Sequence, residues 1–436
     1  MRIVDRLRVL SVYEGFFSGG ARILHSDVVA GLQEGGQYHR VLSIHGEMYR
    51  EATRQKIEDD ACYRSLTAAG VPVTALRAGA PQTSADGLGA FTPAELAATA
   101  RLTADADVIL SLKEQPLELL NQPGLPLRPI IACLHRSDPE NQGPGLQHLR
   151  AAVADGRVAA AICCAESTRT AYQAAGIPAE VLHTIPNGVD LLRFRPDPRR
   201  RELMRASLGI PADATVVIFA ARYAAMKNVP LFLRAAQAFL RREPRGHIIM
   251  CGAGMTPANP ELRRDIAAAF IDEPQYASDI PEQAEWATAA KQGRPRSAGA
   301  GGEASRRTLA DRLSLLGVRG DMEALYAAAD VVSLTSSHGE AAPLCLIEGM
   351  MCGAVPVATD IGDSASIVAG HGILTPADGE TIGDAWLEAA GRRNEFGPAL
   401  LHSRERFSRT RMIASYSALI DRLHHKTGRA SLPDPL

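Results

Sequence analysis

The feature that most constrains the fold is an alternation of short apolar runs with amphipathic helical stretches along the whole 436-residue chain. Continuous apolar strands separated by helices are typical of a parallel sheet covered on both faces. The first set of expected strands lies at residues 7–13, 38–44, 71–76, 107–112, 129–135, 159–165 and 181–186. The second set lies at residues 215–222, 247–252, 331–336, 355–359 and 372–376. Two sets predict two doubly wound, Rossmann-like α/β domains, whose ligands bind at the carboxyl ends of the strands.

Two segments interrupt this alternation. Residues 187–201 hold two prolines and a group of arginines without a core period, and we interpret them as an interdomain linker whose arginines are solvated. Residues 255–307 include a stretch rich in Gly, Ala, Arg and Ser, and we interpret them as a mobile insertion. The predicted domains therefore cover residues 1–190 and 191–410. A helix over 411–436 is expected to pack back toward the first domain.

The composition excludes several classes of protein. Hydrophobic residues make up 46% of the chain and charged residues 22%, which are globular values. The 47 basic side chains are balanced by 49 acidic ones, whereas a nucleic-acid binder would carry a basic excess. The first residues are too charged for a signal peptide and no run of eighteen apolar residues exists, so we predict a cytoplasmic protein without membrane contact. Seven cysteines without a C-x-x-C pair favour reduced thiols over a disulfide frame or zinc site.

The segment from Val331 to Asp363 carries the densest set of polar side chains after a strand. A Ser-Ser-His-Gly loop leads to Glu340, Pro343 stands where a helix would begin, and Glu348 follows about one turn inside that helix. The free amide groups at such a helix start favour an anion beyond the strand end. The two carboxylates can then bracket a ligand. The spacing alone leaves open the alternative that both are ordinary exposed acids.

Three further segments place polar groups at expected strand ends. Gly19 and Gly20 stand between the first strand and a helix, where backbone amides can approach a phosphate. Arg222 and Lys227 follow the first strand of the second domain, and two permanent cations there suit a diphosphate. His135 also follows a strand, and at this position a structural and a functional role are equally consistent with the pattern.

Two other patterns are weaker. The run from Cys251 to Gly254 follows a strand, but Pro257 stands where a dinucleotide fingerprint needs glycine. Asp105 and Asp107 form a literal D-x-D motif. Because they precede their strand, the motif favours a turn and cap over a metal site, and we predict no bound metal.

Taken jointly, these segments resemble the retaining nucleotide-sugar glycosyltransferases of family 4, whose two Rossmann-like domains face each other across a cleft (the GT-B fold). The resemblance covers nearly the whole chain. It rests on the glycine pair of the first loop, the stretch ESTRTAYQAAGIPAEVLHTIPNGVDLLRF, the AARYAAMKN segment, and the Glu340-x7-Glu348 block followed by MCGAVPVATDIGD. It implies that residues 1–190 form an acceptor-side domain and residues 191–410 a nucleotide-sugar domain.

The resemblance also implies a set of site residues. The implied catalytic residues are Glu340, His135, Arg222 and Lys227. The implied donor-binding residues are Gly19, Gly20, Arg222, Lys227, Val318, Arg319, Ala342, Pro343, Leu344 and Glu348. The glycine pair would approach a phosphate oxygen, and the backbone around Val318 and Arg319 would hold the base.

Among these residues, Arg222 and Lys227 would hold the donor diphosphate. Glu348 would bind the ribose hydroxyls, and Glu340, with the backbone of 342–344, would bind the transferred sugar. His135 would contact the sugar or the departing charge. The chain departs from many members of the family at Ala341-Ala342, where they carry Gly and an aromatic residue, and its first loop lacks the Glu common after the alanine.

The implied reaction is metal-independent and uses no cofactor beyond the nucleotide-sugar cosubstrate, for which a UDP-sugar is expected. Cations and a helix terminus can stabilise the charge of the leaving diphosphate, and the sequence offers no clear nucleophile, so the family likeness favours attack on the face that the diphosphate leaves. The expected acceptor is a small molecule or a glycan, and a homodimer is an open option. The alternatives are phosphorolysis, pseudo-glycosyl coupling onto an amine, or a non-catalytic nucleotide-sugar-binding protein.

Overall fold

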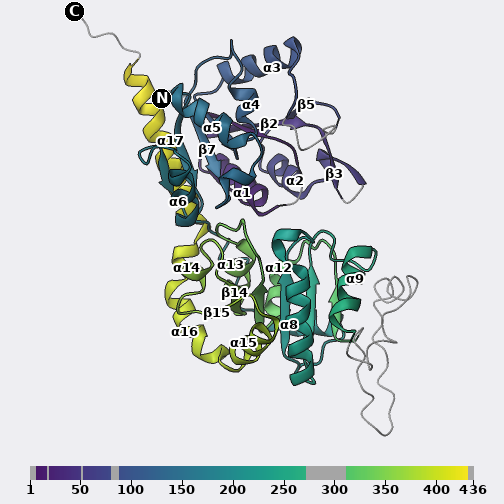
Figure 1. Ribbon diagram of the computed structural model, residues 1–436. Helices are drawn as coiled ribbons and strands as arrows, with labels where there is room; N and C mark the ends of the chain where they lie inside the picture. The colour runs from purple at the N-terminus through teal and green to yellow at the C-terminus, as the bar shows by residue number, and fades with distance from the viewer. Residues whose placement is uncertain (1–5, 17–18, 51–52, 80–87, 272–310, 431–436) are drawn as a thin grey trace, which may run out of the picture. The chain divides into compact units, whose positions relative to one another are not determined.

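The computed structural model describes residues 6–16, 19–50, 53–79, 88–271 and 311–430 (Figure 1). The chain divides into two compact units, Met1–Gly188 with Arg409–Leu436, and Val189–Ser408. Each unit is built on one parallel sheet, so the predicted class of two doubly wound α/β domains is confirmed. None of the helices in the described ranges is both long enough and apolar enough to cross a membrane.

The first unit holds a seven-stranded sheet with the strand order β5-β2-β1-β6-β7-β8-β9. Its strands are β1 (Arg8–Tyr13), β2 (Tyr38–His45), β5 (Val73–Arg77), β6 (Val108–Leu112), β7 (Ile130–Leu134), β8 (Val158–Cys163) and β9 (Leu182–Thr184). Every residue of β6 and β7 is buried, as expected for strands covered on both faces. The strand order reverses between β1 and β6, which pair in parallel with Val12 opposite Ser111. Such a reversal is a switch point of the topology, where a crevice for ligands opens.

The helices of this unit are α1 (Gly20–Glu34), α2 (Ala61–Ala68), α3 (Pro93–Ala104), α4 (Leu117–Leu120), α5 (Gly145–Ala154), α6 (Glu166–Ala174) and α17 (Arg409–Ala430). Helix α17 packs against α1, where Arg409 Nε donates to Asp27 Oδ2 at 2.7 Å and Gln37 Nε2 to Ser417 Oγ at 3.2 Å. Short elements that the apolar pattern did not predict are β3 (Glu47–Arg50), β4 (Thr53–Lys56), η1 (Ile57–Asp59) and η2 (Pro139–Asn141).

The second unit holds a six-stranded parallel sheet with the order β12-β11-β10-β13-β14-β15. Its strands are β10 (Val216–Ala220), β11 (His247–Cys251), β12 (Leu313–Leu315), β13 (Val331–Leu334), β14 (Val355–Thr359) and β15 (Ile373–Thr375). The order reverses between β10 and β13, so this pair forms the switch point of the second sheet. On the sheet, the buried Trp386 ring packs 5.1 Å from that of Phe232, and its Nε1 donates to Ser333 Oγ at 2.9 Å.

The helices of the second unit are α7 (Pro198–Ser207), η3 (Ala225–Lys227), α8 (Val229–Arg242), α9 (Pro260–Ala269), α12 (Met322–Ala328), α13 (Leu344–Met351), α14 (Ser364–Val368), α15 (Gly379–Gly391), α16 (Arg393–Ser403) and η4 (Arg404–Phe407). Helix α9 corrects the prediction of an insertion at 255–307. Its Leu262 and Ile266 are buried against the core because the helix packs on α8, so residues 255–271 belong to the domain. The rest of the predicted insertion lies outside the described residues.

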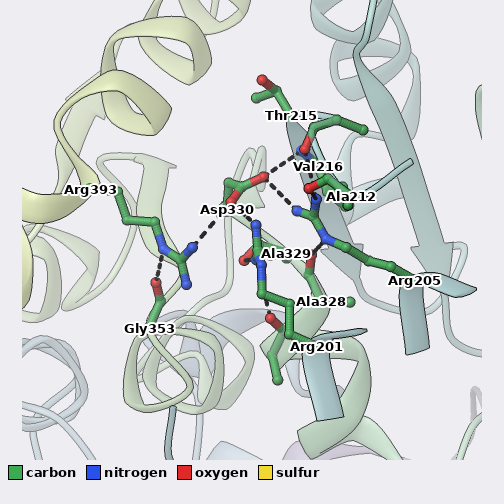
Figure 2. Close-up of polar contacts among 12 residues, drawn as sticks. Arg201, Arg205, Ala212, Thr215, Val216, Ala328, Ala329, Asp330, Gly353 and Arg393 are labelled. Atoms are coloured by element: carbon green, nitrogen blue, oxygen red, sulfur yellow. Dashed lines mark hydrogen bonds and ion pairs between the residues drawn. The ribbon is translucent and has the colours of Figure 1, made fainter. Parts of the chain in front are cut away.

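The arginines of the predicted linker are also not simply solvated, which corrects that interpretation. Asp330, just before β13, accepts hydrogen bonds from Arg201 Nη2 at 2.5 Å, from Arg205 Nη2 at 2.9 Å and from the amide of Val216 at 2.8 Å (Figure 2). Arg393 Nη1 lies 3.3 Å from the same carboxylate. The Arg205 side chain is 4% exposed because it lies in the core beneath this carboxylate.

The same two arginines of α7 also cap the end of α12. Arg201 Nη1 donates to the carbonyls of residues 327, 328 and 329, and Arg205 Nε to that of Ala328. These are among the carbonyls that a helix end leaves without intrahelical partners. Helix α7 therefore fixes α12 and the starts of β10 and β13 at one point.

We expect Asp330→Ala to destabilise the second unit by about 3–5 kcal/mol, because it leaves buried guanidinium groups without their carboxylate. Denaturant unfolding, followed for the transition of this unit, measures the change. Asp384→Ala removes the exposed partner of Arg242 and serves as the control, with an expected change below about 0.5 kcal/mol. Equal midpoints for the two variants would contradict the structural role of Asp330.

Candidate functional site

The carboxyl ends of β10 and β13 bring two loops together at the switch point of the second sheet. Val217 of β10 lies opposite Val331 of β13, so residues 221–228 and 335–343 emerge at the same edge. The amide of Ser337 donates to the carbonyl of Met226 at 2.9 Å, and Thr335 Oγ1 donates to the carbonyl of Lys227 at 3.1 Å. The two loops therefore form one hydrogen-bonded surface.

On this surface the predicted site residues Lys227 and Glu340 form an ion pair, Nζ to Oε1. Their side chains are 15% and 9% exposed, and Ser336 Oγ donates to the same Glu340 oxygen at 2.6 Å. Arg222 follows β10 as predicted and is exposed, with Nη2 at 4.0 Å from the Met226 sulfur. The sequence analysis expected Lys227 to bind the diphosphate and Glu340 to bind the sugar. In the structure the two side chains contact each other. Ser336 was not predicted.

Hydrogen bonds from the end of β14 and the turn after it hold the segment around Glu340 in place. Asp363 donates its amide to the carbonyl of Ala341 at 2.7 Å, and Thr359 Oγ1 donates to the carbonyl of Ser336 at 2.7 Å. Gly362 has φ 62°, and a Cβ there would collide with the carbonyl of Glu340, so this position requires glycine. These contacts come from the run TDIGD at residues 359–363, and the sequence alone did not indicate that this run would hold the Glu340 segment.

Helix α13 begins at Leu344, directly after Pro343, whose missing amide hydrogen costs nothing at a helix start. Pro343 offers no side-chain acceptor to the first-turn amides, and no acidic residue lies in that turn. A Cβ at Gly349 would lie 2.7 Å from Val332 Cβ, so the glycine lets α13 pack closely on β13. Ala342, Pro343 and Leu344 therefore stand at the same sheet edge as Lys227 and Glu340, as predicted from the sequence.

Glu348, also in α13, sits in a different environment from Glu340. Burial raises the pKa of Glu348 to about 7, and the Tyr326 hydroxyl and the charge of Arg193 act in the opposite direction. Arg193 itself donates to Glu323 Oε2 at 2.9 Å. A carboxyl group that is only partly ionised near neutral pH is unusual and marks this position as a candidate binding group. Tyr326 was not predicted, since it lies on α12, distant in sequence.

The segment predicted to hold a base lies after β12. Val318 is 62% exposed, and Arg319 donates to both oxygens of Asp321 at 2.8 and 2.5 Å. The guanidinium is thus fixed within its own loop, which leaves backbone groups and the Val318 side chain to contact a ligand. The loop after β11 is hydrogen-bonded to this segment, because the Gly252 amide donates to the Gly317 carbonyl at 2.7 Å.

The remaining predicted residues belong to the first unit. Gly20 begins α1, and Gly19 has an extended backbone whose carbonyl accepts from the amide of Arg22 at 3.0 Å. His135 follows β7, and its Nε2 is buried without a hydrogen-bond partner. Burial, followed by the charge of Lys113, lowers the pKa of His135 to about 3, so the imidazole is neutral.

The D-x-D motif has the structural role expected from the sequence. Asp107 Oδ2 accepts from the amide of Arg8 at 2.8 Å, and Asp105 pairs with Arg8 at 2.7 Å and Arg40 at 3.3 Å. Within the described ranges, no group of three or more His, Cys, Asp or Glu side chains is arranged to hold a metal ion.

Comparison with known proteins shows which families this chain resembles. Residues 290–391, which include Glu340 and Glu348, match the model of the glycosyl transferases group 1. The D-inositol 3-phosphate glycosyltransferase of Saccharomonospora viridis is 29% identical over 250 residues, which cover 56% of this chain and 49% of that protein. A second such enzyme, from Catenulispora acidiphila, is 28% identical over 51% of this chain and 46% of its own. These likenesses support a glycosyltransferase of the family 4 type.

The chain spans about half the length of the curated relatives that it matches. Solved structures extend the likeness in fold to nearly all of this chain. The Anabaena protein HepE in complex with UDP has a TM-score of 0.69 at 20% identity, over 95% of this chain and 99% of its own. Sucrose-phosphate synthase from Thermosynechococcus elongatus has a TM-score of 0.65 at 16% identity, over 97% and 100% of the chains. These TM-scores support the GT-B fold.

The raised pKa of Glu348 predicts a pH dependence of the stability of this protein. The protonated Glu348 side chain contributes its full share of the unfolding free energy below the ordinary glutamate pKa of about 4.3. This share is lost as pH rises through about 7, because the folded state then holds a buried carboxylate. The difference in unfolding free energy between Glu348→Gln and wild type should therefore change with pH. We expect it to shift by about 1–3 kcal/mol in favour of the variant from pH 5 to pH 8.

Unfolding measured at both pH values tests this prediction. Glu388→Gln is the control, since this side chain is exposed and paired with Arg392, and its difference should stay near zero. A Glu348→Gln difference that is the same at pH 5 and pH 8 would show that the carboxyl titrates normally.

Proposed function

We propose that this protein transfers a sugar from a nucleoside-diphosphate donor to an acceptor hydroxyl, with retention of the anomeric configuration and without a metal ion. The observation that carries the proposal is the Lys227–Glu340 pair at the β10/β13 switch point, beside the start of α13. A cation, a carboxylate and helix amides at one sheet edge suit a phosphate and a sugar side by side.

The chemistry follows from where charge develops. The anomeric C–O bond breaks and its electron pair moves to the diphosphate oxygen. Arg222, Lys227 and the first amides of α13 would stabilise this negative charge, an effect that exceeds their ground-state binding. Glu340 would turn from Lys227 toward the sugar hydroxyls as the diphosphate takes its place beside the ammonium.

Retention is proposed to proceed by attack on the face from which the diphosphate leaves. The acceptor hydroxyl forms the new C–O bond and passes its proton to the departing phosphate oxygen. Glu340 would be a weak nucleophile because the sugar hydroxyls would donate hydrogen bonds to its carboxylate once it has turned from Lys227. The neutral His135 would hydrogen-bond the sugar without adding a competing positive charge.

The comparisons support a choice of substrates for this proposal. HepE was solved with UDP and with UDP-glucose, and we propose a UDP-sugar as the donor here. The relatives from Saccharomonospora and Catenulispora carry the name D-inositol 3-phosphate glycosyltransferase, and we propose a small polyhydroxyl acceptor.

Replacing either cation should slow transfer strongly. We expect Arg222→Ala and Lys227→Ala each to lower kcat/KM by about 10²–10³, with much of the loss in kcat, because charge on the diphosphate grows in the transition state. Lys227→Arg should restore only part of the rate, since a planar fork places charge differently from an ammonium. Arg241→Ala, on the exposed side of α8, is the control and should leave turnover unchanged. Turnover near that of wild type in both alanine variants would move the site elsewhere.

Transfer should persist in EDTA, because protein cations and helix amides carry the proposed charge stabilisation. Steady-state rates with and without chelator, followed by NMR of the product anomer, test the two parts of the proposal together. Loss of activity that Mg²⁺ or Mn²⁺ restores would refute metal independence. An inverted anomer would refute retention.

A further inference from the structure

Two side chains that the proposed reaction uses at different ends of the donor are paired with each other. The ammonium of Lys227 contacts Oε1 of Glu340, and the two side chains are 15% and 9% exposed. A diphosphate that approaches this ammonium therefore meets a carboxylate of the protein already bound to it. The Lys227–Glu340 pair is thus an internal contact that competes with any anionic ligand of this lysine.

Ser336 is a second hydrogen-bond donor to the same carboxylate. Its Oγ donates to Glu340 Oε1 at 2.6 Å, and the residue is 2% exposed. Its backbone is also held, because Thr359 Oγ1 donates to the Ser336 carbonyl at 2.7 Å. The hydroxyl belongs to the same loop as Glu340, whereas the ammonium comes from the loop after β10. Glu340 can therefore leave Lys227 and keep its hydrogen bond to Ser336.

The backbones that carry the ion pair are held together by other bonds. Thr335 Oγ1 donates to the Lys227 carbonyl at 3.1 Å. The Ser337 amide donates to the Met226 carbonyl at 2.9 Å. Breaking the ion pair consequently moves two side chains and leaves the two loops in place.

The pair lies near the first turn of α13, where the diphosphate would bind. Cys345 is the second residue of that helix. Burial raises the pKa of its thiol to about 12, and the charges of Lys227 and Glu340 act on this pKa in opposite directions. Since both charges act on the first turn of the helix, an anion bound there would interact with the ammonium and with the carboxylate.

The energetic balance of an exchange depends on what the ligand carries besides its diphosphate. Burying a charge without compensation is costly. A free nucleoside diphosphate takes the ammonium from Glu340 and offers that carboxylate no donor in return. A nucleotide sugar also takes the ammonium, but its sugar hydroxyls can donate to the displaced carboxylate. The exchange therefore favours the intact donor over the diphosphate alone.

We propose that Glu340 competes with the diphosphate for Lys227, so that the site discriminates the intact nucleotide sugar from the free nucleoside diphosphate. Ser336 is the positioning residue that keeps the displaced carboxylate oriented toward the sugar hydroxyls. When the sugar has been transferred, Glu340 returns to Lys227 and the nucleoside diphosphate is released. The inference rests on the proposed function and adds to it a device for releasing the product.

Isothermal titration of the full chain with UDP tests the competition. We expect Glu340→Gln to bind UDP about 10-fold more tightly than wild type, because a pair formed about nine times in ten lowers the apparent affinity by that factor. Glu380→Gln is the control, since this exposed glutamate pairs with Arg241 and Arg242 at the far end of α8, and its UDP affinity should equal that of wild type. Unchanged or weaker UDP binding by Glu340→Gln would overturn the proposal.

A double-mutant cycle separates competition from simple repulsion between Glu340 and the ligand. Competition needs the ammonium, so Glu340→Gln should change UDP affinity by less than about twofold in a Lys227→Met background. Repulsion needs only the carboxylate and would give the same gain in both backgrounds, which would refute competition. If Lys227→Met does not fold, Lys227→Gln repeats the cycle, since glutamine can still donate a hydrogen bond to the carboxylate.

Titration with UDP-glucose tests the role of the sugar hydroxyls. We expect the ratio of the UDP dissociation constant to the UDP-glucose dissociation constant to fall at least about 10-fold in Glu340→Gln, because hydrogen bonds to a charged acceptor are lost. An unchanged ratio would show that Glu340 does not exchange Lys227 for the sugar.

Ser336→Ala isolates the positioning role of the hydroxyl. We expect UDP-glucose to bind about 10-fold more weakly and UDP to change by less than about threefold, since only the nucleotide sugar uses the oriented carboxylate. Ser336→Thr keeps a hydroxyl and should restore the preference. Ser207→Ala, which removes a hydrogen bond to the Met204 carbonyl in α7, is the control and should change neither affinity. Equal losses for both ligands in Ser336→Ala would assign Ser336 a purely structural role.

The wild-type titrations distinguish failure of this inference from failure of the proposed function. UDP binding by wild type without the gain in Glu340→Gln would refute this inference alone. Absent binding of both UDP and UDP-glucose would refute the proposed function and this inference with it.

Discussion

The parallel pairing of β10 with β13 is the constraint on which the second unit depends. At the amino ends of the two strands, Asp330 stabilises the pairing by accepting hydrogen bonds from the Val216 amide and from the arginines of α7. At its carboxyl end it is locked by hydrogen bonds from Thr335 and Ser337 to the loop of residues 226–227. Because the register is fixed at both ends, the side chains that follow the two strands are held at set distances. A binding site on loops needs this kind of rigid support.

The Lys227–Glu340 pair explains how such a site stays ordered before a ligand arrives. Each group is largely buried, and burying either charge alone would be costly. Together they compensate one another, with Ser336 as a further donor. An anionic ligand can then replace Glu340 beside the ammonium without creating an unpaired charge, provided that the freed carboxylate finds hydroxyl groups. A sugar joined to a diphosphate supplies both partners in one molecule.

The sequence predicted much of this fold because most strands are continuous apolar runs, and β6, β7 and β10 lie where those runs placed them. Strand β12 was missed, although β9 and β15, which have the same length, were predicted. The β3–β4 hairpin was missed since its strands are mostly polar. Arg201 was taken as solvated because its partner Asp330 lies more than 120 positions further along the chain. Patterns local to the sequence carry no signal for such contacts.

For the candidate site, the sequence likewise predicted the positions of residues along the chain but not their contacts. The positions of Arg222, Lys227, Glu340 and Glu348 after their strands follow from the pattern, but the contact between Lys227 and Glu340 depends on which strands become neighbours. The same limit applies to Lys113, whose place after an apolar run resembled that of Lys227. Its positive φ exists only in the folded chain.

The two switch points thus differ in one physical respect. At the second sheet a lysine is compensated by a carboxylate of its own unit, so an anion must displace that carboxylate in order to bind. At the first sheet none of the described carboxylates forms an ion pair with Lys113, and burial and then the charge of Arg22 lower the pKa of this lysine. Displacement makes binding at the second sheet depend on the ligand offering hydroxyls as well as charge.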